Sequence, residues 1–308
     1  MRERAEIVAK AWRPFCPNGH EIADSLDPVR VIGVIGNVNS SKSHYLAGLV
    51  YELIYQQPLR GLSIDVSYLG DSSSIMDARV DTIFSKREKL PNTERGIIGG
   101  PFMYRMTVGV GGDERSFILT FFDVAGEDCT SLRRSADFVR YIFDAVGIIV
   151  LVDPDGLPTS PTRPLSTRSI GAPMANRAMI DTLSHVIQSV TGSAPKDREQ
   201  ALVVALAKAD KLPLSESVYP PPPLSGSARA DIRTLLKEYS DVCRQEIVDL
   251  GGQGIVDAAV SKFGAHQVMF AAVSATGESP LDDGAYGDPK PVGCAMPVAQ
   301  ILLSRDDF

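Results

Sequence analysis

Seven short runs of apolar, largely β-branched residues recur along the chain, and turn residues bound each of them. The runs cover residues 29–36, 62–70, 102–110, 116–124, 145–153, 201–210 and 266–275. Several are apolar on both faces, which is typical of inner strands that helices cover on each side of a sheet. The GGDER segment between the third and fourth runs indicates a hairpin. We therefore expect a mainly parallel sheet with one antiparallel strand.

Helical periodicity fills the gaps between these runs. It is strongest over 228–250, where apolar residues form one stripe, Ser227 can cap the start, and Gly251 and Gly252 can end the helix. Further helices are expected at 43–57, 77–88, 129–144, 174–191 and 294–304. Strands that alternate with helices predict an α/β fold, here a three-layer domain with a mostly parallel, mixed sheet.

Three stretches rich in proline and glycine interrupt this alternation. They cover 153–173, 212–227 and 277–293, and we interpret them as loop insertions because they separate elements of one sheet. The domain is therefore expected to run from 29 to 308. An N-terminal extension, 1–28, precedes it and contains the sequence CPNGH.

The composition limits the classes of function. At 44% hydrophobic and 22% charged residues, the 308-residue chain is typical of a soluble globular protein. Its formal net charge of −7 argues against nucleic acid as a partner, because nucleic-acid binding needs a basic surface. No apolar run reaches the roughly 20 residues that span a bilayer, so we expect no membrane partner. The scattered cysteines and the charged start of the chain favour a cytoplasmic location.

A candidate phosphate loop follows the first apolar run. It matches G-x-x-x-x-G-K-[ST] except at its second glycine and consists of Gly36, Asn37, Val38, Asn39, Ser40, Ser41, Lys42 and Ser43. Backbone N–H groups at a helix start can cradle phosphate oxygens. Lys42 would then reach the outer phosphates and Ser43 would hold Mg²⁺. The side chain of Ser41 is expected to strain a turn that glycine tolerates easily. The alternative is a serine-rich turn before a helix.

Lys42 is also expected to be exposed in the empty loop and to pair only with phosphate. Its replacement would then barely change the stability of the protein without ligand.

Three more polar motifs follow apolar runs. In the first, FFDVAGED, Asp123 can hold the Mg²⁺ shell and Gly126 lets a backbone N–H approach the terminal phosphate. In the second, LAKAD, Asp210 has two acceptor oxygens for the N1–H and N2–H₂ of guanine, and the stem of Lys208 can lie across the base. The third is VSATG, 273–277. Taken singly, each is also compatible with a solvated strand end.

The ordered set GNVNSSKS, DVAG, AKAD and SAT resembles the four signatures of P-loop GTPases of the Ras-like, translation-factor class. The long spacings and the ending PVGCAMPVAQILL are more similar to bacterial double-GTPase-type proteins associated with conflict systems. The resemblance implies a P-loop NTPase fold, GTP and GDP as ligands, Mg²⁺, and hydrolysis of GTP to GDP and phosphate as a molecular switch. The residues to which it assigns roles are Gly36, Lys42 and Ser43 at the phosphates, Asp123 and Gly126 in the second switch, and Lys208, Asp210, Ser274 and Ala275 at the base.

Three residues depart from the family pattern. Ala207 stands in place of an asparagine, Val38 in place of a small residue beside the terminal phosphate, and Glu127 in place of a glutamine that orients water. We therefore expect slow intrinsic turnover that a protein partner or self-association accelerates, with Arg133 or Arg134 as a candidate arginine supplied across a dimer. The alternative is a degenerate GTPase that acts as a nucleotide-binding or nucleotide-free scaffold. An adenine-specific ATPase is disfavoured by the LAKAD motif.

The first switch should supply a threonine that ligates Mg²⁺ and senses the third phosphate. Thr93 is the candidate because it lies in the Pro- and Gly-bounded loop LPNTERG, whereas Thr82 lies in a segment with helical character. With Lys42 and Glu127, Thr93 completes the candidate catalytic set.

Cys16 and His20 resemble half of a zinc ribbon. A structural zinc site usually has four ligands. Cys129, Cys243 and Cys294 fall in expected helices and supply no second pair, so zinc is not expected unless another chain completes the site. His44, His185 and His266 are interpreted as structural.

Overall fold

Seven strands form one sheet in the order β2-β3-β4-β1-β5-β6-β7. The computed structural model describes residues 27–37, 40–56, 63–69, 72–91, 98–110, 113–124, 142, 144–162, 172–219 and 229–303. The strands are β1 (Val29–Gly36), β2 (Ser63–Leu69), β3 (Ile98–Val110), β4 (Asp113–Val124), β5 (Ala145–Val152), β6 (Ala201–Leu206) and β7 (Val268–Ala272). Each of the seven apolar runs is therefore a strand, as expected, although the last two strands end before their runs do.

The sheet has one strand that runs against the others. β1 pairs in parallel with β4 and β5, and the β5–β6 and β6–β7 pairs are also parallel. β3 pairs antiparallel with both β2 and β4. The expected hairpin and the single antiparallel strand are both confirmed.

The helices follow the expected alternation with one addition. They are α2 (Lys42–Tyr51), α3 (Ser72–Val80), α6 (Ala172–Thr191), α7 (Arg229–Ile247), α8 (Gln253–Phe263) and α9 (Met296–Leu303). π-helical turns extend α2 over Glu52–Gln56, α3 over Asp81–Ser85 and α7 over Val248–Gly252. The helix expected at 129–144 lies almost entirely outside the described residues.

Several helix boundaries differ from expectation: the helix expected at 77–88, for example, is α3 with its extension and covers 72–85. Gly251, with φ 83°, interrupts the π-helical extension of α7 close to the expected helix end, but the chain turns there directly into α8, which the sequence reasoning missed. The last helix begins at Met296, so Cys294 lies in the turn before it and is not helical. Pro297 explains this start, because a proline is well tolerated in the first turn, where its missing N–H would have no partner in the helix.

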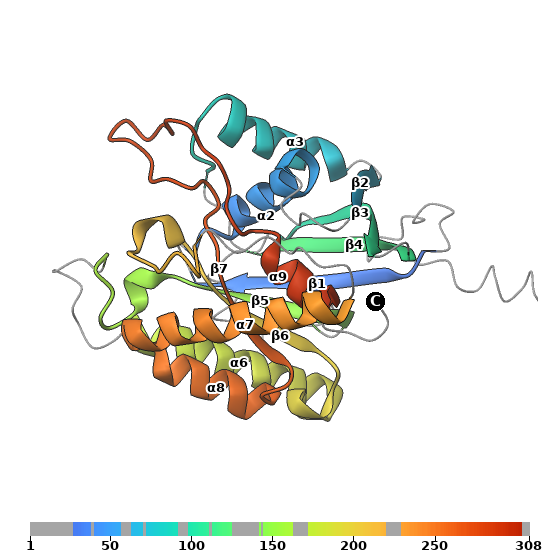
Figure 1. The fold of residues 1–308 in the computed structure, drawn as a ribbon, viewed down its shortest axis with the longest axis vertical. Helices are drawn as coiled ribbons and strands as arrows, with labels where there is room; N and C mark the ends of the chain where they lie inside the picture. The colour runs from blue at the N-terminus through green and yellow to red at the C-terminus, as the bar shows by residue number, and fades with distance from the viewer. Residues whose placement is uncertain are drawn as a thin grey trace, which may run out of the picture.

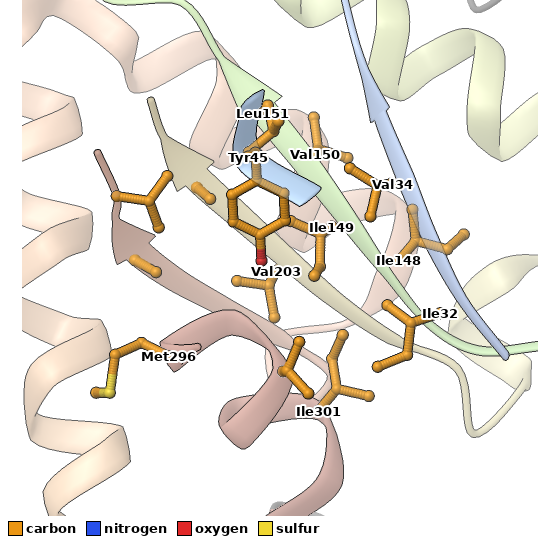
Figure 2. Close-up of a cluster of buried hydrophobic side chains, with 14 of the residues drawn as sticks. Ile32, Val34, Tyr45, Ile148, Ile149, Val150, Leu151, Val203, Met296 and Ile301 are labelled. Carbon is orange, nitrogen blue, oxygen red and sulfur yellow. The ribbon is translucent and has the colours of Figure 1, made fainter. Parts of the chain in front are cut away.

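The core lies on both sides of the central strands. Every residue of β6 and nearly every residue of β5 is buried, so helices cover both faces of the sheet there. α2 and α3 pack together toward the β2–β4 side, whereas α6 and α8 pack together at the opposite side (Figure 1). Side chains of β1, β5 and α9, among them Ile32, Ile148 and Ile301, belong to one buried cluster with Tyr45 of α2 (Figure 2). The expected α/β fold with a mostly parallel mixed sheet is confirmed.

The described parts of the three expected loop insertions contain no strand, and their α-helical residues are 172 and 173, where α6 begins. A short 3₁₀ turn, Pro154–Gly156, lies in the first of them. The last one is tied to the rest of the domain by isolated bridges from Ala285 to Glu88 and from Val292 to Ser274. Within the described residues, none of the helices combines the length and the apolar character needed to cross a membrane.

Candidate functional site

The polar motifs meet at one edge of the sheet. β1, β4, β5, β6 and β7 are parallel, so their carboxyl ends lie along the same edge. These five ends carry, at the last strand residues or directly after them, the candidate phosphate loop, Asp123, Asp153, the LAKAD motif and the VSATG motif. In open α/β sheets, ligands bind at this edge.

The start of the candidate phosphate loop requires glycine. A Cβ on Gly36 would collide with the side chain of Ser40 and lie 3.1 Å from the carbonyl oxygen of Leu151. The backbone N–H of Ser40 donates to the carbonyl of Asn37 at 3.1 Å and closes a tight turn. The loop therefore packs closely against the ends of β1 and β5. Val38 and Asn39 lie outside the described residues.

Ser41 occupies the position of the second glycine of the pattern in the conformation that glycine favours. Its φ is 62° and its ψ 33°, in the left-handed region. Its carbonyl oxygen accepts the N–H of Tyr45 at 2.8 Å and so begins α2. The strain expected from a side chain at this position is therefore present in the backbone.

Replacing Ser41 by glycine is expected to stabilise the protein by about 0.5–1 kcal/mol, because glycine adopts the left-handed region without a Cβ clash. Urea denaturation of the ligand-free protein measures this change. Ser261→Gly is the matched control, since Ser261 is an exposed residue of α8, where glycine should destabilise by about 0.5 kcal/mol. Equal destabilisation by both substitutions would contradict the strain at Ser41.

Lys42 is not exposed, in contrast to the expectation from the sequence. Its side chain is 8% exposed, and its Nζ donates to the carbonyl oxygens of Gly36 at 2.9 Å and Asn37 at 3.1 Å. It also lies 3.5 Å from Oγ of Ser40. A buried ammonium group needs such partners, because its desolvation is otherwise costly. The side chain of Lys42 therefore stabilises the candidate phosphate loop through these hydrogen bonds, although it was expected to be exposed there.

Lys208 and Asp153 form an ion pair at the ends of β6 and β5. Nζ of Lys208 lies 2.7 Å from Oδ2 of Asp153 and 3.9 Å from Oδ2 of Asp155. Lys208 itself has φ 54°, which turns the chain sharply after Ala207. Sequence reasoning missed Asp153, although its place directly after an apolar strand was the same signal that selected Asp123.

Asp210 and Ser274 come together from motifs 64 residues apart. The hydroxyl of Ser274 donates to Oδ1 of Asp210 and accepts the N–H of Gly277 at 2.9 Å. Among the described residues, no hydrogen bond reaches Oδ2 of Asp210, which can therefore serve as an acceptor. Ala275 follows, and its carbonyl oxygen would lie 2.8 Å from a Cβ on Gly48, so this loop packs directly on α2.

Two tyrosines lie near Asp210. Burial raises the pKa of Tyr219 to about 12, and the negative charge of Asp210 adds to the rise. Burial likewise raises the pKa of Tyr286 to about 12, again with a contribution from Asp210. Both belong to loop segments without periodicity, so no pattern in the sequence could have selected them.

Two contacts join helices to the candidate loops. Nδ2 of Asn37 donates to Oδ1 of Asn176 on α6 at 2.8 Å. The ring of His44 accepts the N–H of Leu90 at its Nε2, at 3.3 Å, which agrees with a structural role for this histidine. Leu90 lies three residues before Thr93.

For the two candidate switches, the structure describes the chain segments on either side and not most of the candidate residues themselves. Asp123 is the penultimate residue of β4, where only its backbone is described. The chain enters β3 at Ile98 and leaves β4 at Val124, and these two residues pair with each other. Thr93, Gly126, Glu127, Arg133 and Arg134 lie outside the described residues, as do Cys16 and His20.

Two of the residues that the sequence analysis expects to hold Mg²⁺, Ser43 and Asp123, lie at this edge of the sheet. Ser43 lies in the first turn of α2, and Asp123 is the penultimate residue of β4, the strand that pairs with β1. Mg²⁺ prefers such oxygen ligands and commonly takes only one or two from a protein. Within the described residues, no three or more His, Cys, Asp or Glu side chains gather as they would around a metal ion.

Comparisons with known proteins give one family. A family model described as Double-GTPase 2 matches residues 30–253, more than half of the chain. No curated protein matches the sequence. Among the solved structures that do match is the crystal structure of sup35 complexed with GDP, with a TM-score of 0.30 and 12% sequence identity. That match covers 87% of this chain and 44% of the other, so the chain spans less than half the length of that protein.

Proposed function

We propose that the chain, which belongs to the Double-GTPase 2 family, binds GTP and hydrolyses it to GDP and phosphate as a molecular switch. The observation that carries the proposal is the meeting of Lys42, Lys208, Asp210 and Ser274 at one edge of the sheet. A phosphate-binding element and a base-reading element are both needed for a nucleotide.

Asp210 would read the base. Its carboxylate accepts hydrogen bonds from the N1–H and N2–H₂ of guanine, and adenine offers no matching pair of donors. The hydroxyl of Ser274 holds this carboxylate in one orientation. The aliphatic stem of Lys208 would lie along the base while its ammonium stays paired with Asp153. Ala275 would present its backbone to the base oxygen.

The phosphates would lie along the loop from Gly36 to Ser43. Backbone N–H groups and the start of α2 favour an anion there, and Lys42 would neutralise the outer phosphates. Ser43, Asp123 and Thr93 would hold Mg²⁺, which, when bound, offsets the charge that develops on the transferred phosphoryl group.

Intrinsic turnover is expected to be slow. A branched side chain at Val38 would crowd the attacking water, and an ionised Glu127 cannot donate a hydrogen bond to the phosphoryl oxygens. An arginine supplied in trans, with Arg133 or Arg134 of a second copy as candidates, would accelerate the reaction by about 10³–10⁵. Phosphate release measured across protein concentration checks this: turnover on the order of 1 s⁻¹ by a dilute monomer would contradict it.

Chromatography of the nucleotide released from denatured, purified protein tests the proposal as a whole. We expect GDP or GTP in amounts close to that of the protein. Adenine nucleotides in their place would favour the ATPase that the LAKAD motif argues against.

A second candidate is a degenerate GTPase that serves as a scaffold in a bacterial conflict, defence or signalling complex. The left-handed backbone of Ser41 and the missing asparagine at Ala207 favour it. It predicts GTP binding without phosphate release, or no bound nucleotide at all. In either case we expect a protein partner in the cytoplasm, with nucleic acid and membrane playing no part.

A further inference from the structure

Glu52 is a buried carboxylate for which the proposed function has no use. It begins the π-helical turn after α2 and is 1% exposed. Its Oε2 accepts the N–H of Ala295 at 2.7 Å. Burial raises the pKa of Glu52 to about 7, and hydrogen bonds from the backbones of Ala295, Cys294 and Gly293 oppose that rise. The described residues form no ion pair with it, so these backbone amides are what compensates its burial.

The turn that Glu52 holds, Gly293–Ala295, is anchored a second time by Tyr45. The hydroxyl of Tyr45 donates to the carbonyl oxygen of Cys294 at 2.9 Å, while its ring packs in the core beside β5 and α9 (Figure 2). Two residues of α2 and its extension therefore fix both the amide side and the carbonyl side of this turn.

The same turn is bonded to Ser274. Ser274 and Val292 exchange two backbone hydrogen bonds, of 2.9 and 2.8 Å. The thiol of Cys294 also donates to the carbonyl oxygen of Ser274 at 3.4 Å. Ser274 in turn orients Asp210 through its hydroxyl. The contacts thus run without a break from Glu52 to the carboxylate proposed to read guanine.

We propose that Glu52 is a positioning residue for guanine recognition, acting through the Gly293–Ala295 turn and Ser274 on Asp210. This inference rests on the proposed function. If it is correct, a substitution at Glu52 changes the orientation of the Asp210 carboxylate. The hydrogen bonds between that carboxylate and the base should then weaken most. The contacts to the phosphates begin at Gly36 and share none of these hydrogen bonds, so they should be preserved.

The test compares the affinities of GDP and inosine diphosphate, which lacks the 2-amino group that Asp210 would accept. For the parent protein we expect GDP to bind about tenfold or more tightly than inosine diphosphate, the ratio that a hydrogen bond to a charged group typically supplies. In Glu52→Leu this ratio should fall below about threefold, and inosine diphosphate, which keeps the N1–H, should lose less affinity than GDP. In Glu52→Gln the ratio should stay near that of the parent, because an amide oxygen still accepts the N–H of Ala295.

Val256→Ala is the matched control for a loss of stability alone. Val256 is fully buried in α8, away from the turn, so its truncation should lower the melting temperature and leave the ratio unchanged. If Glu52→Leu does not fold, Tyr45→Phe replaces it, because it removes only the hydrogen bond to Cys294 and should lower the ratio severalfold.

Each outcome decides the proposal. Selective loss of GDP affinity in Glu52→Leu or Tyr45→Phe, with recovery in Glu52→Gln, supports it. Equal losses for both nucleotides, or a ratio equal to that of the parent, overturn the role of Glu52 and leave the proposed function intact. A parent protein that binds GDP no more tightly than ADP overturns the proposed function, and the role of Glu52 with it.

Discussion

Replacing Lys42 by alanine is expected to weaken GTP binding by about 100-fold or more, because the loop loses its charge-assisted hydrogen bond to the outer phosphates. The substitution should also destabilise the protein without ligand by about 1–2 kcal/mol. The carbonyl oxygens of Gly36 and Asn37 lose the donor that now lies 2.9 and 3.1 Å away. Calorimetric titration and urea denaturation measure the two effects separately.

Lys237→Ala is the control for Lys42→Ala. Lys237 is an exposed residue of α7, and its loss makes the same change of charge without touching the loop, so binding and stability should both stay near those of the parent. GTP affinity equal to that of the parent in Lys42→Ala would show that the phosphate loop is wrongly assigned. Lost binding with unchanged stability would instead contradict the importance of the two carbonyl contacts.

Replacing Asp210 by alanine is expected to remove the preference for guanine. The parent should bind GDP more tightly than ADP by about 10- to 100-fold, and the variant should bind both nucleotides with the same low affinity, since a hydrogen bond to a charged group typically contributes about 1.5–3 kcal/mol. Ser274 should remain in place, because its backbone is fixed by Val292. Titration with fluorescent guanine and adenine nucleotides measures the preference.

Asp282→Ala provides the comparison for Asp210→Ala. Asp282 is an exposed carboxylate in the loop between β7 and α9, so its loss changes the net charge equally and should leave the preference intact. A guanine preference that survives in Asp210→Ala would mean that the base is read elsewhere.

The strands were predictable because turn residues bound each apolar run and because even the edge strand β2 alternates exposed and half-buried side chains. The sharp turn at Gly251 was predictable as a helix end, but whether a second helix follows such a turn depends on what it packs against. α8 finds its partner in α6, which is more than sixty residues earlier in the sequence. The local sequence pattern around residues 253–263 cannot predict this contact with α6.

In the candidate site, too, some residues could be predicted from local motifs and others could not. Lys42, Asp210 and Ser274 could be selected because each stands in a short motif directly after a strand. The pairing of Lys208 with Asp153 and the burial of Lys42 could not, because both depend on how close two strand ends come in three dimensions. Glu52 could not be selected from the sequence for the same reason. Its proposed role depends on the contact with Ala295, which lies 243 residues later in the chain.

The order of strands in the sheet also has a consequence for how the chain folds. β1 is made early, yet both of its neighbours, β4 and β5, lie far along the chain, and the local pairings are those of β2, β3 and β4. The hairpin strands can therefore assemble first, while β1 must wait until a long loop closes. The segment from Gly36 to Ser43 cannot take its final shape before that late step. A nucleotide should consequently slow the unfolding of this protein much more than it speeds the folding.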